Sequence, residues 1–305
     1  MDIIELQEKI REEKEKNGTL ILAHTYQSPE IIDIADVTGD SYALAKAATK
    51  YQNKRVLLCG VRFMAETVKI LSPEKEVVLP EPEATCPMAE QISPERVRKF
   101  KIENPDFSVV AYINTTAALK AECDVCVTSS SAIKIVSAME SKNILFIPDK
   151  NLGSFVKEKL PEKNIVLWDG YCPVHNQITA DDVKKAKSEY PDALLAVHPE
   201  CPKEVLPFAD YIGATSGIID FALNSDKPVI IGTEGGVYDS LILKHKDKKF
   251  YQLAKQKLIC EDMKKTDIQK VYNALVGKGG ENIQLDETLR LKAKVSLDNM
   301  LKYGG

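Results

Sequence analysis

Short apolar runs alternate with amphipathic stretches from the beginning of the chain onward. Residues 20–23, 55–60 and 76–79 are rich in aliphatic side chains, which predicts buried strands. Residues 2–16 and 63–70 place apolar side chains three and four positions apart, which is the spacing of one helix face. Apolar strands that alternate with amphipathic helices are typical of parallel sheets covered by helices. The pattern therefore predicts an α/β fold.

The same pattern begins again about 87 residues later, and then once more. Ser93 and Thr179 each precede a predicted helix, and Pro94 lies in the first turn of the earlier one. A predicted strand follows each helix, over residues 109–112 and 194–198. This period is far longer than a solenoid unit. We therefore expect three homologous three-layer α/β/α domains.

Three cysteines recur with the same period. Cys86, Cys172 and Cys260 are separated by 86 and 88 residues, and each follows an apolar, strand-like run. One thiol in each third of the chain indicates a single metal centre built from three domains. Three thiolates would leave one iron of an iron–sulfur cluster open as a Lewis acid. Buried free thiols are the simpler alternative, and zinc is another because His175 follows Cys172 by three residues.

Polar residues recur in the same register, just beyond predicted strands or at predicted helix starts. Such positions bind ligands in open α/β sheets. The alternatives are N-capping for the hydroxyls and a structural role for the histidines. If the domains surround an axis, the three sets converge on one pocket. The sets are His24, Tyr112 and His198; Tyr26, Asn114 and Glu200; and Ser41, Ser129 and Thr215.

Composition and charge narrow the function classes. The 305 residues carry a net charge of −4 and 7% aromatic residues, so we expect no nucleic-acid or membrane partner. The N-terminus does not read as a signal peptide and no apolar run is long enough to span a membrane, which predicts a cytoplasmic protein. Seven cysteines in such a chain favour metal ligands or free thiols over disulfides. Cys123 and Cys126 form a Cys-x-x-Cys whose spacing is not repeated, so we interpret them as structural.

Motifs along essentially the whole chain resemble the quinolinate synthetase A family, the quinolinate synthases. The resemblance implies three α/β domains around a pseudo-threefold axis, with a 4Fe–4S cluster and the active site at the centre. It also implies condensation of iminoaspartate with dihydroxyacetone phosphate to quinolinate, phosphate and water, in NAD biosynthesis. The motifs include Ala23-His24-Thr25-Tyr26-Gln27, Gly39-Asp40-Ser41, Ala84-Thr85-Cys86-Pro87-Met88-Ala89, Tyr112-Ile113-Asn114, Pro148-Asp149-Lys150-Asn151-Leu152, Cys172-Pro173-Val174-His175, His198-Pro199-Glu200-Cys201-Pro202, Gly232-Thr233-Glu234 and Cys260-Glu261-Asp262-Met263-Lys264.

The resemblance also implies residue roles. Cys86, Cys172 and Cys260 would hold the cluster, one from each domain. The substrate pocket would be lined by His24, Ser41, Tyr112, Asn114, Ser129, His198, Glu200 and Thr215.

Catalytic roles are expected for Tyr26 and for four residues of this pocket. Glu200, Tyr26 and Tyr112 would transfer protons, while His24 and His198 would orient carboxylates and assist. An aspartate oxidase or dehydrogenase that supplies iminoaspartate is the expected functional partner. Another iron–sulfur hydro-lyase is the alternative among enzymes, and an iron–sulfur redox or sensor protein is the alternative from another class.

The expected domain boundaries follow the three cysteines. The domains would span residues 1–88, 89–175 and 176–262. The tail, residues 263–305, has no partner in the repeat, and we expect it to pack back on the first domain near the N-terminal helix. Its apolar spacing predicts one helix over residues 263–274 and another from Asp286 onward.

Overall fold

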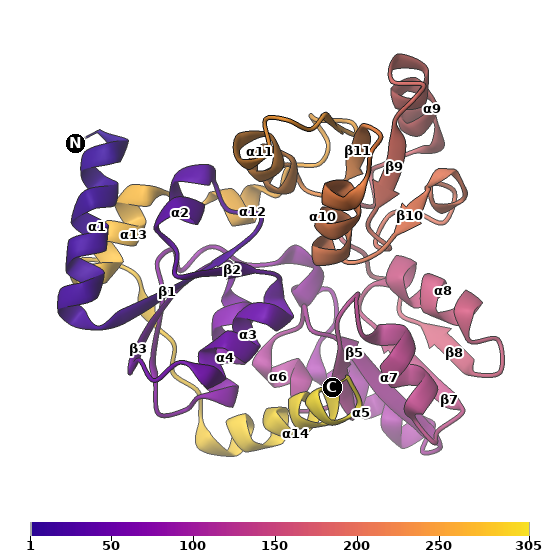
Figure 1. Cartoon of the computed structure of the whole chain (residues 1–305). Coiled ribbons are helices and arrows are strands. Elements are labelled where there is room, and N and C mark those ends of the chain that lie inside the picture. The colour runs from indigo at the N-terminus through magenta and orange to yellow at the C-terminus, as the bar shows by residue number, and fades with distance from the viewer. Residues whose placement is uncertain (1, 305) are drawn as a thin grey trace.

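The computed structural model describes residues 2–304, which contain three separate β-sheets flanked by helices (Figure 1). In the first sheet, β1, β2, β3 and β4 are parallel and β13 pairs antiparallel with β4. The strand order is β13-β4-β3-β1-β2, and the bounds are β1 (Thr19–His24), β2 (Val37–Gly39), β3 (Arg55–Cys59), β4 (Glu76–Leu79) and β13 (Glu281–Asn282).

The other two sheets each have four strands, and all pairs in them are parallel. Parallel pairing with intervening helices confirms the predicted α/β class. The second sheet has the order β6-β5-β7-β8, with β5 (Phe107–Tyr112), β6 (Val125–Val127), β7 (Asn143–Ile147) and β8 (Asn164–Leu167). The third has the order β10-β9-β11-β12, with β9 (Leu194–Val197), β10 (Tyr211–Ile212), β11 (Val229–Gly232) and β12 (Phe250–Gln252).

Helices connect the strands of each sheet. The expected starts after Ser93 and Thr179 are confirmed, and the Thr179 side chain forms a capping box with Asp182. The helices are α1 (Ile3–Asn17), α2 (Pro29–Ile34), α3 (Ser41–Lys50), α4 (Arg62–Leu71), α5 (Pro94–Glu103), α6 (Ala117–Lys120), α7 (Ala132–Ala138), α8 (Lys150–Lys159), α9 (Ala180–Glu189), α10 (Thr215–Asn224), α11 (Gly235–Lys244), α12 (Glu261–Lys264), α13 (Ile268–Leu275) and α14 (Glu287–Gly304).

The tail differs from its prediction in two respects. The single helix expected over residues 263–274 is wrong, because Asp267 caps a new helix, α13, through the backbone N–H of Lys270. Helix α13 packs against α1 and β3, whereas α14 lies along α6 and β6 of the second sheet and also touches α4 (Figure 1). The side chain of Asn299 donates to the backbone oxygen of Asp124, which ties α14 to the second sheet.

One polar contact recurs in all three sheets. An aspartate accepts a hydrogen bond from the backbone N–H of a central strand and forms an ion pair with a lysine of the preceding helix. The three aspartates are separated by 88 and 86 residues, which are also the separations of His24, Tyr112 and His198. This common spacing supports three related units. The contacts are Asp36 with Ile21 (2.8 Å) and Lys14 (2.8 Å), Asp124 with Val109 (2.7 Å) and Lys101 (2.9 Å), and Asp210 with Leu195 (2.8 Å) and Lys187 (2.8 Å).

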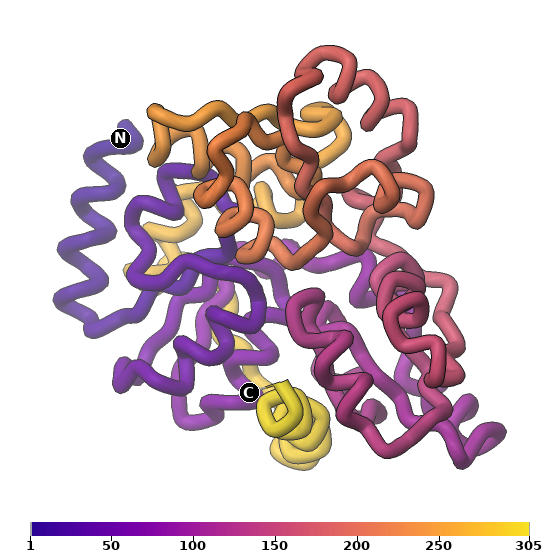
Figure 2. Tube along the Cα trace, turned by 45° about the vertical axis from the view of Figure 1, so that its right-hand side comes forward, coloured from indigo at the N-terminus to yellow at the C-terminus, as the bar shows by residue number. Residues whose placement is uncertain are grey.

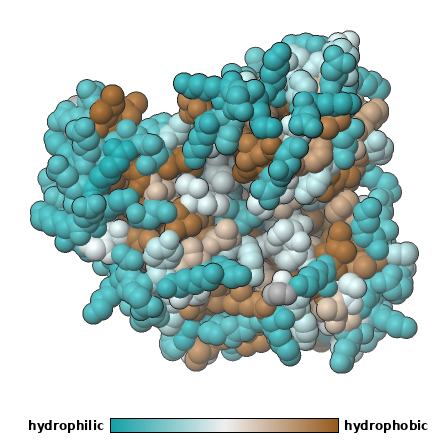
Figure 3. Space-filling view, in the orientation of Figure 1, coloured by the Kyte–Doolittle hydropathy of each residue, from teal (hydrophilic) through white to brown (hydrophobic). Residues whose placement is uncertain are grey.

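The three sheets with their helices surround a common centre in the cartoon (Figure 1), and the Cα trace turned by 45° shows the same arrangement of the chain (Figure 2). Polar side chains cover much of the periphery, while less polar residues gather in the middle of the face (Figure 3). Between residues 2 and 304, no helix is both long and apolar enough to cross a membrane.

Candidate functional site

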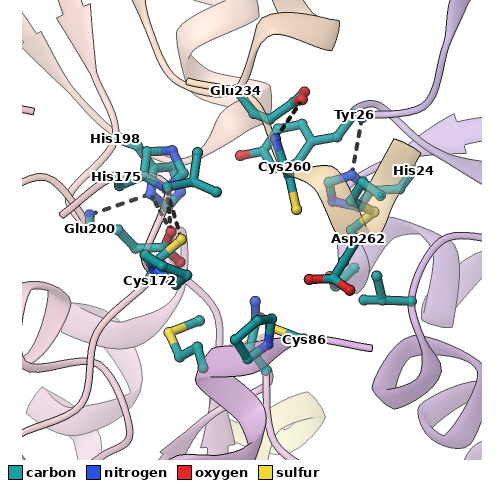
Figure 4. Close-up of a pocket in the computed structure, with 18 of the residues that line it drawn as sticks. His24, Tyr26, Cys86, Cys172, His175, His198, Glu200, Glu234, Cys260 and Asp262 are labelled. Atoms are coloured by element: carbon teal, nitrogen blue, oxygen red, sulfur yellow. Dashed lines mark hydrogen bonds and ion pairs between the residues drawn. The ribbon is translucent and has the colours of Figure 1, made fainter. Parts of the chain in front are cut away.

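A cavity of about 530 Å³ lies between the three sheets, and all twelve residues singled out from the sequence line it. The sulfur atoms of Cys172 and Cys260 point into this space, and Cys86 lies at its edge (Figure 4). The twelve are His24, Tyr26, Ser41, Cys86, Tyr112, Asn114, Ser129, Cys172, His198, Glu200, Thr215 and Cys260.

The parallel sheets bring these side chains to the cavity. His24 is the last residue of β1, Tyr112 is the last residue of β5, and His198 directly follows β9. Because the carboxyl ends of parallel strands meet at one edge of a sheet, each sheet presents its polar residues at that edge. The three edges face the same cavity.

His24 and His198 are held in the same way. Each Nδ1 accepts a hydrogen bond from the backbone N–H two residues later, that of Tyr26 (3.1 Å) and that of Glu200 (3.4 Å). The proton of each neutral ring is therefore on Nε2. Burial lowers the pKa of His24 to about 3 and the pKa of His198 to about 4. Both residues are thus neutral N–H donors near neutral pH, and His198 Nε2 lies 3.2 Å from Ser129 Oγ.

Glu200 is a buried carboxylate among imidazoles. Its Oε2 lies 2.7 Å from His175 Nδ1 and 3.6 Å from His198 Nδ1, and the Tyr112 hydroxyl also hydrogen-bonds to it. Burial alone would raise the pKa of Glu200, but the hydrogen bonds from His175 and from the Tyr112 hydroxyl hold that pKa below its ordinary value. The carboxylate is therefore ionised near neutral pH and can accept a proton.

A chain of hydrogen bonds joins Glu200 to Tyr26. His175 Nδ1 lies 2.7 Å from Glu200 Oε2, and its Nε2 lies 3.0 Å from Thr233 Oγ1. Thr233 Oγ1 is in turn 3.0 Å from the Tyr26 hydroxyl, which also lies 3.0 Å from Thr215 Oγ1. Burial and the charge of Glu200 raise the pKa of Tyr26 well above its usual value. Tyr26 is therefore a protonated donor connected to a carboxylate acceptor.

The three hydroxyl residues are not N-caps, so that interpretation is wrong. Ser41 and Thr215 are the first residues of α3 and α10, whose N-cap residues are Asp40 and Ala214. Ser129 lies further from its helix, α7, which begins after Ser131. All three hydroxyls line the cavity instead. The helix N-termini at Ser41 and Thr215 carry free N–H groups of the kind that binds anions.

The three repeated cysteines are half-buried free thiols. Burial raises the pKa of Cys86 to about 12 and the pKa of Cys260 to about 12, and it also raises the pKa of Cys172. A metal that binds these thiols must displace their protons. Among the described residues, Cys123 and Cys126 do not line the cavity, and Cys126 Sγ lies 3.4 Å from Ser296 Oγ in the core. Those two thiols are structural, as predicted.

Comparison with known proteins gives a consistent result. A family model described as quinolinate synthetase A protein matches residues 8–302. The chain belongs to the quinolinate synthetase A family. It is 48% identical over 305 residues to the quinolinate synthase of Caldicellulosiruptor bescii, with all of both chains covered. It is also 48% identical to that of Clostridioides difficile, with 96% of each chain covered, and 46% identical to that of Clostridium perfringens, with 99% and 100% covered.

The donor set of this family member suits a metal centre. Three thiols line one cavity, and one ligand atom from each of Cys172, His175 and Glu200 also lies within 4.8 Å of the others. The close approach of His175 to Glu200 is already explained by their 2.7 Å hydrogen bond. The thiols are therefore the donors left for a metal, and soft thiolates suit iron–sulfur clusters.

Four residues at or beside the cavity are not among the site residues expected from the sequence. His175 is weighed there only as a zinc ligand, and Thr233, Asp149 and Glu234 occur only within longer motifs. A signal did exist, because Asp149 and Glu234 each lie two residues after the third strand of a sheet, β7 or β11. They are 85 residues apart, so the register of 86 used for the cavity residues misses their relationship.

Proposed function

We propose that this protein is a quinolinate synthase, which condenses iminoaspartate with dihydroxyacetone phosphate to give quinolinate, phosphate and water in NAD biosynthesis. The observation that carries the proposal is the convergence of three cysteines and nine polar residues on one cavity. Full-length relatives that carry this name support it. The substrates carry phosphate and carboxylate groups, which match the N–H and hydroxyl donors of the cavity.

The metal centre is a 4Fe–4S cluster held by Cys86, Cys172 and Cys260. When bound, a cluster with three protein thiolates supplies a Lewis acid, because its fourth iron keeps an open position. The thiols of this chain deprotonate on binding it, since their pKa values are raised in its absence.

Substrate anions are held by neutral donors. His24 and His198 present Nε2–H groups, and Ser41 and Thr215 present hydroxyls at the N-termini of two ten-residue helices. Helix N-termini bind phosphate and carboxylate through free N–H groups and the helix dipole. Neutral donors bind an anion without the cost of burying another charge. These groups orient the two substrates toward one another.

Proton transfer falls to Glu200, Tyr26 and Tyr112. Glu200 is ionised and serves as the general base, whereas burial keeps the hydroxyls of Tyr26 and Tyr112 protonated because it raises the pKa of each. Carbon–carbon bond formation requires removal of a proton from carbon, and dehydration requires a proton for the departing oxygen. One base and two acids in the same cavity meet these requirements.

The test is an anaerobic incubation of the reconstituted protein with oxaloacetate, ammonia and dihydroxyacetone phosphate, followed by measurement of quinolinate and phosphate. We expect both products. Without quinolinate formation, another iron–sulfur hydro-lyase or a redox protein becomes the better assignment. Metal analysis of the same sample checks the zinc alternative, because iron and sulfide in equal amounts are expected and zinc is not.

Iminoaspartate is an unstable imine, so an aspartate-oxidising reaction in the same compartment must supply it. We propose an aspartate oxidase or dehydrogenase as the supplying enzyme, and the cytoplasm as the compartment.

A further inference from the structure

The segments that carry the three cysteines are anchored by the same backbone contact. In each sheet, a strand-to-helix turn donates one N–H to the carbonyl oxygen two residues before the cysteine. The bonds are Arg62 to Ala84, Lys150 to Gly170 and Gly235 to Leu258, each 2.8 Å long. This contact fixes the approach of each segment but leaves the N–H of the cysteine itself without a defined role.

Two of the turns hold the cysteine N–H as well. Asp149 Oδ2 accepts from the backbone N–H of Cys172 at 2.9 Å, and Glu234 Oε1 accepts from that of Cys260 at 3.2 Å (Figure 4 shows the second bond). The other oxygen of each carboxylate caps a helix, by accepting from Leu152 N–H at 2.7 Å in α8 and from Gly236 N–H at 2.7 Å in α11. Both side chains are fully buried.

The corresponding place in the first sheet is Val61, the residue before Arg62. Its aliphatic side chain cannot accept a hydrogen bond, so Cys86 has no equivalent carboxylate there. The segments of Cys172 and Cys260 are therefore each held by the backbone contact and by a carboxylate, whereas the segment of Cys86 has the backbone contact without the carboxylate. A buried carboxylate is costly, and its appearance at two matching places indicates a function beyond capping.

We propose that Asp149 and Glu234 are positioning residues for the metal centre, and that each fixes the direction of one cysteine thiolate through its backbone N–H. This inference rests on the proposed cluster site. A carboxylate suits the task because its two oxygens accept from two different segments at once, whereas an amide offers only one such oxygen. Outer residues of this kind hold metal ligands in place and are typically worth about 10–100-fold in metal affinity or activity.

Glu234 reaches further than Asp149. Its Oε1 lies 3.3 Å from Lys264 Nζ, and Lys264 also donates to the backbone oxygen of Tyr26. The backbone of Tyr26 packs closely against Gly236, because a Cβ on Gly236 would lie only 2.8 Å from the backbone oxygen of Tyr26. Glu234 thus connects the segment of Cys260 to the segment of a proposed catalytic tyrosine. Its loss should lower the turnover of each remaining cluster, whereas loss of Asp149 should not.

The test compares the wild-type protein with D149A and E234A, and with the conservative variants D149N and E234Q. The control is D210A, because Asp210 also accepts a strand N–H (2.8 Å) but lies outside the cavity. After anaerobic reconstitution, four properties are measured: iron and sulfide per chain, the rate of iron loss to a chelator, the electron paramagnetic resonance spectrum of the reduced cluster, and the rate of quinolinate formation per bound cluster. Circular dichroism and thermal unfolding report on the fold.

We expect D149A and E234A to lose iron about 10-fold faster than the wild type and to show an altered spectrum. D149N and E234Q should lie between the wild type and the alanine variants, because one acceptor oxygen remains. D210A should match the wild type in all four measured properties. Wild-type iron retention and spectrum in D149A and E234A would overturn the inference, and so would equal iron loss in D210A. A wild-type protein that binds no iron or forms no quinolinate would instead contradict the proposed function.

Discussion

The outer ends of the three sheets and the central cavity were built from the same repeat, yet they differ in how much of it they keep. At the outer position all three sheets have an aspartate bound to a strand N–H and a lysine, with N–H···O distances of 2.7–2.8 Å. At the cavity one cysteine and one hydroxyl residue recur from each third of the chain, but another set of equivalent positions holds Tyr26, Asn114 and Glu200. The cavity therefore keeps only part of the repeated chemistry.

The difference has a physical reason. Each outer aspartate satisfies a backbone N–H that would otherwise be left without a partner, and that requirement is identical in every sheet. The proposed substrates have no threefold symmetry, and in the proposed reaction Glu200 serves as the base while Tyr26 and Tyr112 serve as acids. Under that proposal, the sheets can supply different groups at equivalent positions. Substitutions in the two regions should therefore have different consequences.

The largest effect is expected from the substitution of a cavity cysteine. Cys172→Ala should abolish the cluster and quinolinate formation, because only two of the three thiolate ligands of the 4Fe–4S cluster would remain. Iron content and visible absorbance after anaerobic reconstitution measure the loss. Cys59→Ala is the matched control, since Cys59 is a buried thiol of β3. Full iron content in Cys172→Ala would remove Cys172 from the ligand set.

A smaller effect is expected from Glu200→Gln, which keeps the shape of the side chain and removes the base. Turnover should fall by about 10²–10⁴-fold, which is the usual contribution of a positioned acid or base. Initial rates of quinolinate formation at matched iron content measure it. Wild-type turnover in this variant would show that another group accepts the proton.

The pH dependence of stability should reveal the buried His24. Its pKa is about 3 in the folded chain, below the ordinary value of 6.5, so on acidification the unfolded chain takes up the proton first. The unfolding free energy should therefore fall as the pH falls from 7 to 5, by about 2 kcal/mol from this residue alone. Urea unfolding of the iron-free wild type and His24→Asn at both pH values isolates this contribution. An equal change in both proteins would show that His24 does not have a lowered pKa.

The smallest effect is expected at the periphery. Asp36→Ala, Asp124→Ala and Asp210→Ala should each lower the unfolding free energy by about 1 kcal/mol, because each removes one hydrogen bond to a strand. Turnover per bound iron should stay at the wild-type level. Equal losses of stability among the three variants would show that the three aspartates have the same structural role. Loss of turnover in any of them, at full iron content, would show that the outer aspartates also affect catalysis.

Much of this arrangement could be predicted from the sequence because a repeat gives two independent signals, the apolar pattern of the strands and the constant offset between equivalent polar residues. Apolar runs give the strands, and a constant offset carries His24 to Tyr112 and His198, all of which line the cavity. The alternative of N-capping for Ser41 is wrong because the N-cap of α3 is its neighbour, Asp40. Propensity alone does not separate these two positions.

Contacts between sheets could not be predicted in the same way. Thr233 matters because it touches both His175 and Tyr26, and these three residues come from different sheets. Nothing in the local sequence of a threonine records such a partner. The placement of α14 along the second sheet likewise depends on tertiary packing, since its apolar stripe fits more than one surface.

Whether quinolinate formation depends on a cluster in this cavity is tested most directly by the rate of the reaction as a function of iron content in the wild-type protein. Anaerobic reconstitution with graded amounts of iron and sulfide gives samples of increasing occupancy. If one cavity combines the cluster with the acid–base residues, the rate should rise with occupancy and reach its maximum at about four iron and four sulfide per chain. An iron-free chain that forms quinolinate at the full rate would contradict the account.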